Sequence, residues 1–385
     1  MGIAIMSHTS PTRRGFLHAA SILPIAAVRG TAANSAVTVG LVGCGNRGTY
    51  LGQTLTEHTQ ARLTSLCDLY PEQIAKARQK IGRSEFAVFG ELDKMLASPV
   101  DAVLIATPVF LHPEHFEAAV KAGKHVYLEK PAAPDVEGCT RIEKAAAAAA
   151  RDRDLGFGFQ RRHGAVYTAG YQFLQSGKIG AIGMASVRFV KSDGGGRPKT
   201  QGPPKTLDEK IKNWYLWRAL CGDQIVENNC HLIDVMNWFV GSRPESAIGD
   251  GGRTPGKDGD VRDYNNVIYQ YPRNVKGSLW GTTLAPPSHR DVREEFYGAA
   301  GWLETSELGW RYRLAGKEAA EVKSPRNISI DSVVAFVNRI QSGKTENTIA
   351  RGVESSLTAI LGRLAMDLRR PVSWGEMLAS NGWPA

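Results

Sequence analysis

The stretch Val37-Thr-Val-Gly-Leu-Val-Gly-Cys-Gly-Asn-Arg-Gly48 joins a short apolar run to three glycines spaced as GxGxxG. Its β-branched first half predicts a buried parallel strand, and a helix is expected directly after the glycines. Gly43 allows a tight turn, Gly45 lets the backbone approach a pyrophosphate, and Gly48 lets the helix pack closely on the strand. The stretch therefore predicts a dinucleotide-binding loop, with the pyrophosphate on the N-terminal amides of the helix.

A second apolar run ends in an acid at Asp68, which follows Gly48 by 20 residues. At this spacing a carboxylate can accept a hydrogen bond from the 2′-hydroxyl of a ribose. The acid favours NAD because it would repel the 2′-phosphate of NADP, although Arg47 and Lys76 leave NADP open. Asn46 and Arg47 are predicted to contact the cofactor together with the glycines, because they begin the helix.

Strands and helices alternate through the rest of the first half of the chain. Further apolar runs predict three strands and two helices, at residues 100–106, 125–128, 155–159, 113–122 and 136–150. This alternation predicts an α/β domain with a doubly wound parallel sheet of the Rossmann type over residues 34–160. Ligands bind such sheets at the carboxyl ends of the strands. Those ends carry further candidate ligands, namely Thr107, Pro108, Glu129, Lys130, Arg161 and Arg162.

The pattern changes after about residue 160. Short apolar runs separated by Gly, Pro and Asn turns predict strands at 183–191, 265–271, 277–283, 293–297 and 302–305. These strands predict an α+β domain over residues 161–385 with a large mixed or antiparallel sheet. A helix expected at 353–368 closes this domain.

The composition excludes several classes of protein. Hydrophobic residues make up 42% and charged residues 22% of the 385 residues, as in a soluble globular protein of two domains. The formal net charge is +9, but the basic residues are scattered and form no DNA-binding motif, so nucleic acid is not an expected partner. Beyond the N-terminus no apolar run approaches the ~20 residues that span a bilayer, so stable membrane insertion is not expected.

Cysteine and histidine spacing gives no metal site. The five cysteines have neither a CxxC pair nor zinc-ligand spacing, and they are Cys44, Cys67, Cys139, Cys221 and Cys230. We expect buried free thiols, as in a protein that folds in a reducing cytoplasm. The sequence His112-Pro-Glu-His115 is not HExxH, so no catalytic metal is expected.

Residues 1–33 are typical of a targeting segment. The stretch Thr12-Arg-Arg-Gly-Phe-Leu17 is followed by an apolar run at 19–28 and small residues at 31–33. Adjacent arginines before Phe and Leu resemble a twin-arginine export signal, and a chance arginine pair in a leader is the alternative. The sequence therefore predicts a periplasmic or otherwise exported protein that uses the twin-arginine machinery.

An ordered set of motifs at the strand ends resembles a known family. A glycine loop is followed by Ala106-Thr-Pro108, by His112 and then by Glu129-Lys-Pro131. This order, with a match over residues 36–375, resembles the glucose–fructose oxidoreductase / inositol dehydrogenase / MocA family. The resemblance implies that Lys130 is catalytic beside the nicotinamide and that Glu129 holds the ribose or nicotinamide side. It also implies cofactor contacts from Thr107, Pro108, His112 and Arg161.

The stretch Gly222–Trp238 carries the second half of the predicted catalytic site. Helical spacing places Glu227, His231 and Asp234 on one face. A carboxylate one turn before a histidine can orient the imidazole and raise its basicity, although a lone helical histidine is more often structural. The resemblance makes His231 the base and Glu227 its partner, where relatives commonly have Asp. Asp234 is expected to pair with a nearby cation.

Together these features predict an exported NAD(P)-dependent oxidoreductase that moves a hydride between a sugar or polyol hydroxyl and a tightly bound cofactor. Candidate substrate contacts are Arg162, Trp214, Tyr215 and Trp217, and the three aromatic residues fit interdomain packing equally well. The resemblance also implies a homodimer or homotetramer. One alternative is an NAD-dependent glycosidase that oxidises its sugar transiently and eliminates the glycosidic group. A second alternative is a non-catalytic sugar-binding protein.

Overall fold

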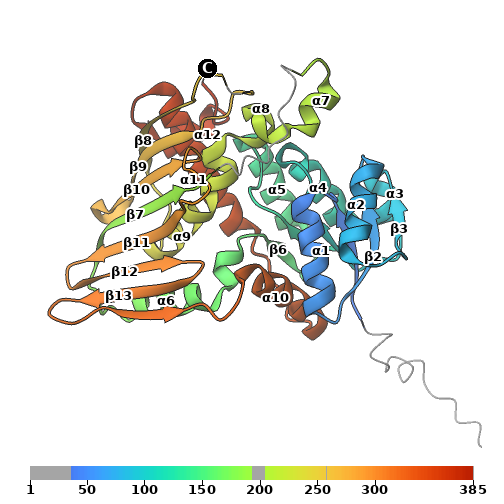
Figure 1. Ribbon diagram of the computed structural model, residues 1–385, viewed down its shortest axis with the longest axis horizontal. Helices are drawn as coiled ribbons and strands as arrows, with labels where there is room; N and C mark the ends of the chain where they lie inside the picture. The colour runs from blue at the N-terminus through green and yellow to red at the C-terminus, as the bar shows by residue number, and fades with distance from the viewer. Residues whose placement is uncertain (1–35, 193–203, 257, 385) are drawn as a thin grey trace, which may run out of the picture. The chain divides into compact units, whose positions relative to one another are not determined.

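The computed structural model describes residues 36–192, 204–256 and 258–384. The predicted export signal lies outside this part of the chain, as does most of the loop between residues 193 and 205. From Val37 onward the chain forms one unit with two β-sheets (Figure 1). No helix of the described residues is both long and apolar enough to cross a membrane.

The first sheet has six parallel strands in the order β3-β2-β1-β4-β5-β6. They are β1 (Thr38–Val42), β2 (Arg62–Cys67), β3 (Ala87–Phe89), β4 (Ala102–Ile105), β5 (His125–Leu128) and β6 (Leu155–Phe157). Strand β1 pairs with β2 on one side and with β4 on the other, so the winding direction reverses at β1. A crevice forms outside the strand ends at such a reversal. The predicted doubly wound parallel sheet is confirmed.

Helices cover both faces of this sheet. They are α1 (Asn46–His58), α2 (Pro71–Ile81), α3 (Leu92–Leu96), α4 (His112–Lys121) and α5 (Val136–Ala148). Side chains alternate between the two faces of a strand, so neighbouring residues enter different cores. Leu41 of β1 packs in one core with Leu51 of α1, whereas Val42 lies in the other core with Phe116 of α4 and Ile142 of α5.

The second sheet has nine strands in the order β14-β13-β12-β11-β7-β10-β9-β8-β15. They are β7 (Ile182–Val190), β8 (Ser246–Gly252), β9 (Tyr264–Gln270), β10 (Lys276–Thr282), β11 (Asp291–Gly298), β12 (Gly301–Ser306), β13 (Gly309–Leu314), β14 (Ala320–Lys323) and β15 (Val372–Ser373). Strands β7 and β10 pair in parallel, and the other neighbouring pairs are antiparallel. The predicted mixed sheet is confirmed.

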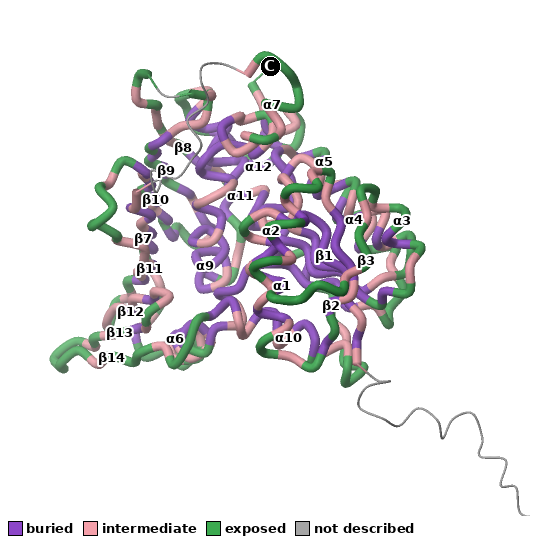
Figure 2. Tube along the Cα trace, turned by 45° about the vertical axis from the view of Figure 1, so that its right-hand side comes forward, coloured by how far each residue is buried: buried purple, intermediate pink, exposed green. Residues whose placement is uncertain are grey.

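One face of the second sheet is buried under helices. These are α6 (Ala165–Gln175), α9 (Cys230–Val240) and α11 (Ile349–Leu368), which contact β12, β7 and β8 respectively. Along β9 the side chains of Val267 and Tyr269 are buried, whereas Ile268 points outward and is 53% exposed. In Figure 1 and Figure 2 these three helices lie on the face of the second sheet that is turned toward the first sheet.

Strand β8 was not predicted, because its sequence Ser-Ala-Ile-Gly-Asp-Gly-Gly has no apolar run. Its glycines allow α11 to pack closely on the sheet. A Cβ atom at Gly251 would lie 2.9 Å from the sulfur of Met366 and 2.7 Å from the carbonyl oxygen of Tyr264. This strand therefore depends on tertiary packing rather than on β propensity.

Helix α10 (Ile328–Ser342) belongs to the second half of the sequence but packs on the first sheet. Its residues Val333, Phe336 and Val337 lie in the same core as β1 and α1. The ring of Phe336 also meets Tyr127 of β5 edge to face at 5.6 Å between centroids. The nucleotide-binding half is therefore completed by residues more than 150 positions away.

A fully buried arginine on α11 connects three segments that are distant in the sequence. Arg363 donates hydrogen bonds to the carbonyl oxygens of Pro134 at 2.5 Å, Gly222 at 3.1 Å and Gly382 at 2.7 Å. Its guanidinium also lies over the ring of Trp383, 3.5 Å from the centroid. Burial lowers the pKa of Arg363 to about 10, which still leaves the group charged at neutral pH.

We expect Arg363→Met to lower the free energy of unfolding by about 3–5 kcal/mol, because three buried carbonyl groups lose their donor. Urea unfolding followed by circular dichroism measures the change. Arg311→Met is the matched control, because Arg311 is 48% exposed and pairs with Glu304 on the sheet surface. The control is expected to change stability by less than about 1 kcal/mol. Equal stability losses in the two variants would contradict the role of Arg363.

Candidate active site

The glycine loop joins β1 to α1 and has the geometry of a phosphate cradle. Gly43 has φ +89°, and a Cβ atom there would lie 2.7 Å from the carbonyl carbon of Ala106. A Cβ atom at Gly48 would lie 1.9 Å from the carbonyl oxygen of Gly43, so close helix–strand packing requires glycine. No atom lies within 4 Å of a Cβ placed on Gly45, which leaves the approach to the helix amides open. The loop therefore fits a dinucleotide pyrophosphate.

Two carboxylates hold this loop and the start of α1 from the ends of two other strands of the first sheet. Asp68, which follows β2, accepts hydrogen bonds from the backbone N–H of Cys44 at 2.7 Å and of Tyr70 at 2.9 Å. Glu129, which follows β5, accepts from Nε of Arg47 at 2.8 Å and is buried. Asn46 is exposed at the start of α1. The loop and the start of α1 are thus held in place from the ends of two strands, β2 and β5.

His112 has a different role from the predicted one. Its side chain is 1% exposed, and both ring nitrogens face backbone carbonyl oxygens, Pro131 O at 2.7 Å and Thr107 O at 2.9 Å. Burial lowers the pKa of His112 to about 4, which favours a neutral ring that donates a hydrogen bond to one of these two carbonyl groups. The prediction that His112 contacts the cofactor is wrong, because the ring is enclosed. It joins the loop after β4, which carries Thr107 and Pro108, to the loop after Lys130.

Lys130 and Glu227 come together from the two halves of the chain. The ammonium of Lys130 donates to Oε1 of Glu227 at 2.9 Å and to its backbone carbonyl at 2.6 Å. Burial alone would lower the pKa of Lys130, but the Glu227 carboxylate raises it overall, so the side chain stays charged. The peptide bond between Lys130 and Pro131 is cis. The structure therefore places a largely buried cation at the carboxyl end of β5.

Glu227 does not orient the imidazole of His231 as predicted. Residues Ile225–Asn229 form a π-helical turn before α9, and the Glu227 carboxylate engages Lys130 and the amide of Asn228. Within the described chain, Nδ1 of His231 is buried and has no hydrogen-bond partner. The sequence predicted a regular helix here, with Glu227 facing His231. The π-helical turn instead directs the Glu227 carboxylate toward Lys130.

His231 is the second residue of α9 and lies within the influence of the Lys130 charge. Burial, and next the charge of Lys130, hold the pKa of His231 well below its usual value. The imidazole is therefore neutral at neutral pH, the form that can accept a proton. One side of the ring meets Phe159 in an edge-to-face contact with centroids 6.0 Å apart.

The two arginines after β6 point to different partners. Arg161 is 2% exposed and donates to the hydroxyl of Tyr167 at 2.9 Å and to Glu307 at 3.1 Å. Its Nη1 is buried without a partner in the described chain, so contact with the cofactor stays a prediction. Arg162 pairs with the fully buried Asp234, 2.8 Å away, which confirms the predicted cation partner of Asp234.

A segment of the second half returns to the nucleotide-binding half. Helix α7 (Leu207–Lys212) contacts it near Asp68, because the hydroxyl of Tyr70 donates to Asp208 at 2.7 Å. Helix α8 (Arg218–Cys221) contacts the turn Val109–Leu111 after β4. Between these helices lie the partly buried rings of Trp214, Tyr215 and Trp217, and their contact with substrate stays a prediction.

Sequence reasoning missed a group of buried amides below the π-helical turn. Asn229 is fully buried, and both polar atoms of its amide lack partners in the described chain. Nearby, the amide of Asn265 on β9 donates to Oε1 of Gln224. Asn228-Asn229 in an otherwise apolar stretch was the available signal, because consecutive amides are unfavourable inside a helix.

Comparison with known proteins agrees with this geometry. The family model described as "Oxidoreductase family, NAD-binding Rossmann fold" matches residues 37–154, and the "GFO/IDH/MocA C-terminal domain" matches residues 167–304. The chain belongs to the Gfo/Idh/MocA family. Its first half is accordingly an NAD-binding Rossmann domain, and the predicted cofactor class and enzyme class are confirmed at this level.

Similar members of the Gfo/Idh/MocA family differ in their reactions. Inositol 2-dehydrogenase 2 of Saccharopolyspora erythraea is 28% identical over 75% of this chain and 80% of its own length. The 2,7-anhydro-N-acetylneuraminate hydratase of Escherichia coli is also 28% identical, over 73% of this chain and 71% of its length. A solved structure of levoglucosan dehydrogenase with NADH and levoglucosan superposes with a TM-score of 0.76 at 18% identity, covering 88% of this chain and 99% of that one.

The position of Asp68 predicts selectivity for NAD over NADP. Its carboxylate would repel a 2′-phosphate, and Arg47 is held by Glu129 instead of facing this position. We expect Asp68→Ala to reduce the ratio of NAD to NADP affinity by roughly 10- to 100-fold. Isothermal titration with each cofactor measures the ratio. Glu72→Gln, an exposed acid one helical turn further on, should leave the ratio unchanged. An unchanged ratio in Asp68→Ala would contradict the assignment.

Proposed function

We propose that this chain is an exported oxidoreductase that transfers a hydride between a sugar or polyol hydroxyl and a tightly bound nicotinamide cofactor. The observation that carries the proposal is the meeting of a charged Lys130 with Glu227 and a neutral His231 next to an open dinucleotide loop. Family relatives that carry the names inositol dehydrogenase and levoglucosan dehydrogenase support a polyhydroxylated substrate.

The side chains have complementary tasks in this proposal. His231 accepts the proton of the substrate hydroxyl, since its lowered pKa leaves the imidazole unprotonated at neutral pH. The ammonium of Lys130 stabilises the negative charge that develops on the substrate oxygen. Glu227 holds Lys130 in position and keeps it charged. The bound nicotinamide supplies hydride chemistry, and the protein supplies geometry and charge.

Cofactor retention is supported by the segment that crosses from the second half of the chain. The contact of α7 with Tyr70 lies two residues beyond Asp68, and Lys212 stands 4.8 Å from the centre of the Tyr70 ring. A helix placed here narrows the exit at the adenosine end of the expected cofactor position. Such retention suits a protein that works where free NAD is scarce.

Export rests on the sequence of the leader. The stretch 12–17 with its two arginines supports twin-arginine transport, which carries folded proteins. All five cysteines are buried and free, which confirms the prediction for the thiols and suits folding before export. Cell fractionation tests the proposal: full-length protein should reach the periplasm, and a variant with Arg13→Lys and Arg14→Lys should remain in the cytoplasm. Periplasmic arrival of both would overturn it.

The outer face of the second sheet supports a homo-oligomer. Neighbouring strands expose large apolar side chains there, namely Met184, Ile248, Ile268, Trp280 and Tyr297. Several large apolar side chains exposed together on one face of a sheet are typical of an interface between protein chains. Light scattering with size-exclusion chromatography should give the mass of a dimer or tetramer, and a monomeric mass at micromolar concentration would contradict the proposal.

The decisive experiment uses the protein purified from the periplasm. The protein is denatured, released nucleotide is identified by mass spectrometry, and intact protein is screened with sugars and polyols for a change in reduced-nicotinamide absorbance. Stoichiometric NAD(H) whose redox state responds to a sugar is the expected result. Absence of nucleotide, together with no uptake of added NAD, would overturn the proposal and favour a non-catalytic binding protein.

A redox-neutral reaction is the second candidate, and the hydratase relative favours it. A transiently oxidised sugar can undergo elimination and then be reduced again, so the cofactor shows no net change. Glu227 at a position where the family commonly has Asp supports a changed reaction. Glycosidic cleavage of a test substrate without net change in NAD(H) would select this candidate over net oxidation.

A further inference from the structure

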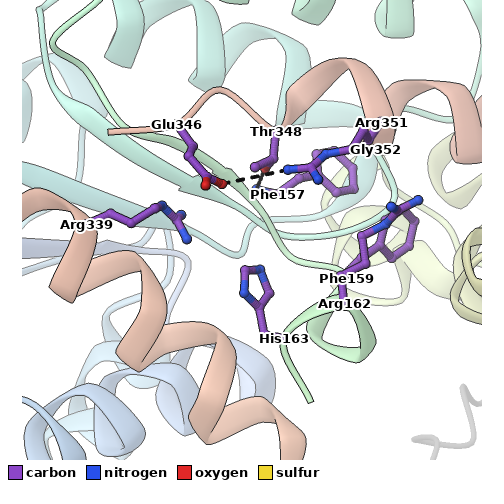
Figure 3. Close-up of a pocket in the computed structure, with 9 residues that line it drawn as sticks. All are labelled: Phe157, Phe159, Arg162, His163, Arg339, Glu346, Thr348, Arg351 and Gly352. Atoms are coloured by element: carbon purple, nitrogen blue, oxygen red, sulfur yellow. Dashed lines mark hydrogen bonds and ion pairs between the residues drawn. The ribbon is translucent and has the colours of Figure 1, made fainter. Parts of the chain in front are cut away.

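A cavity of about 230 Å³ lies on the edge of the first sheet, away from the glycine loop. Strand β6, the 3-10 turn Gln160–His163 and the first turn of α11 form its walls with α10. Four basic side chains line it, Arg162, His163, Arg339 and Arg351. Figure 3 shows that Arg339 and Arg351 approach the same space from opposite sides, with the ring of His163 between them.

Two of the arginines are fixed from behind by buried carboxylates. Arg162 binds Asp234 and Arg339 binds Asp154 through Nε and Nη2, at distances from 2.7 to 3.0 Å. The hydrogen bonds that both guanidinium groups donate to described residues use Nε and Nη2 and leave Nη1 without one. The arginines are therefore held rigidly, as a binding site requires.

The third arginine is held only loosely. Arg351 is 3.8 Å from Glu346, which also lines the cavity, and both side chains are more than half exposed, at 55% and 56%. Such an ion pair contributes little and opens readily. An anion in the cavity would therefore bind the guanidinium of Arg351 with little loss of free energy from opening the Arg351–Glu346 ion pair.

Three arginines and three carboxylates, Asp154, Asp234 and Glu346, surround the cavity, and at His163 the arginine charges dominate. Burial lowers the pKa of His163 to about 4, and the charges of Arg339, Arg351 and Arg162 act in the same direction. The pKa of Arg351 is also lowered, by burial and then by Arg162. The N-terminus of the 20-residue helix α11 adds to the field because its first turn has no acidic residue, and the side chain of Asn347 accepts a hydrogen bond from the N–H of Ile349.

We propose that this cavity binds a phosphate-sized oxyanion, either inorganic phosphate or the phosphate group of a phosphorylated sugar. Its volume lies below the roughly 300–1,000 Å³ of sites for larger ligands, which favours a small anion. Arginine forks match the oxygens of phosphate, and the helix amides add donors. The site is distinct from the proposed catalytic one, since Lys130, Glu227 and His231 do not line it.

Phe159 connects the two sites. It lines the cavity, and its ring meets that of His231 with centroids 6.0 Å apart. An anion in the cavity therefore lies one aromatic ring away from the proposed base.

Isothermal titration calorimetry with sodium phosphate tests this proposal on protein saturated with NAD, so that the glycine loop does not take up the anion. Sodium chloride of equal ionic strength is the reference. We expect phosphate to bind the wild type, and Arg351→Gln to weaken binding by at least about tenfold. His163→Gln should weaken it less, because a neutral ring offers one donor. Arg370→Gln, which removes an arginine of similar exposure paired with Glu376 outside the cavity, should bind as the wild type does.

Glucose 6-phosphate is the second probe and separates the two sources. Tighter binding than phosphate, lost in Arg351→Gln, would identify a phosphorylated sugar, and equal or weaker binding would identify the free anion. No phosphate heat above the chloride reference would overturn the proposal, as would equal affinity in the wild type and a folded Arg351→Gln. Either result leaves the proposed oxidoreductase activity untouched, because that activity is measured separately on released cofactor and sugar.

Discussion

Lys130→Met is expected to reduce kcat by about 10²–10³-fold while the cofactor stays bound. The ammonium of Lys130 is the charged donor that we assign to the reaction centre, and methionine keeps its length without its charge. Lys130 also neutralises Glu227 at 2.9 Å, so the variant leaves that carboxylate without this partner. Because removal of a transition-state contact lowers kcat and kcat/KM together, both should fall by similar factors.

Steady-state kinetics with the best substrate of the sugar screen, and mass spectrometry of bound nucleotide, measure the two effects. Lys144→Met is the matched control, because Lys144 lies exposed on α5 of the same domain. The control should retain wild-type rates. Turnover of Lys130→Met within about threefold of the wild type would rule out the assigned role.

His231→Asn is expected to lower kcat by about 10²–10⁴-fold, the usual contribution of a general base. The effect should also appear in the pH profile. The pKa of His231 lies well below its usual value, so its neutral, proton-accepting form persists through neutral pH and is lost only as the pH falls through that lowered pKa. The wild-type profile of kcat/KM should therefore have an acid limb below about pH 6.5.

The residual activity of His231→Asn should lack this acid limb. His289→Asn, at an exposed position on the second half of the chain, is the control and should keep both rate and profile. An acid limb that survives in His231→Asn would assign the titration to another group. Near wild-type turnover would instead assign His231 a structural role beside Phe159.

Local patterns in the sequence were sufficient for the nucleotide-binding half. The glycines between β1 and α1 predicted the loop correctly, because the turn, the helix contact and the phosphate approach all act within twelve residues. Buried parallel strands appear as continuous apolar runs, so the alternation with helices could be followed along the chain. The pairing of Asp234 with a cation followed from the cost of burying an unpaired charge.

The candidate site was predicted less completely than the fold. Lys130, Glu227 and His231 do lie near one another, but the sequence paired Glu227 with His231, and the structure pairs it with Lys130. The π-helical turn at Ile225–Asn229 was not predicted, because the spacing of Glu227 and His231 was counted with regular α-helical periodicity, which the extra residue of the turn changes. The family resemblance similarly implied a cofactor contact for His112, whereas the structure buries its ring between two loops.

The sequence by itself therefore determined the parallel sheet, its glycine loop, the acid at Asp68 and the free thiols, because each depends on neighbours within a few residues or on one residue's own chemistry. Only the tertiary structure decided where α10 packs, which carboxylate meets Lys130 and which arginines share a cavity. These contacts join residues separated by about a hundred positions or more, such as Lys130 and Glu227. Which residues meet depends on how whole helices and sheets pack against one another. The local sequence pattern does not specify that packing.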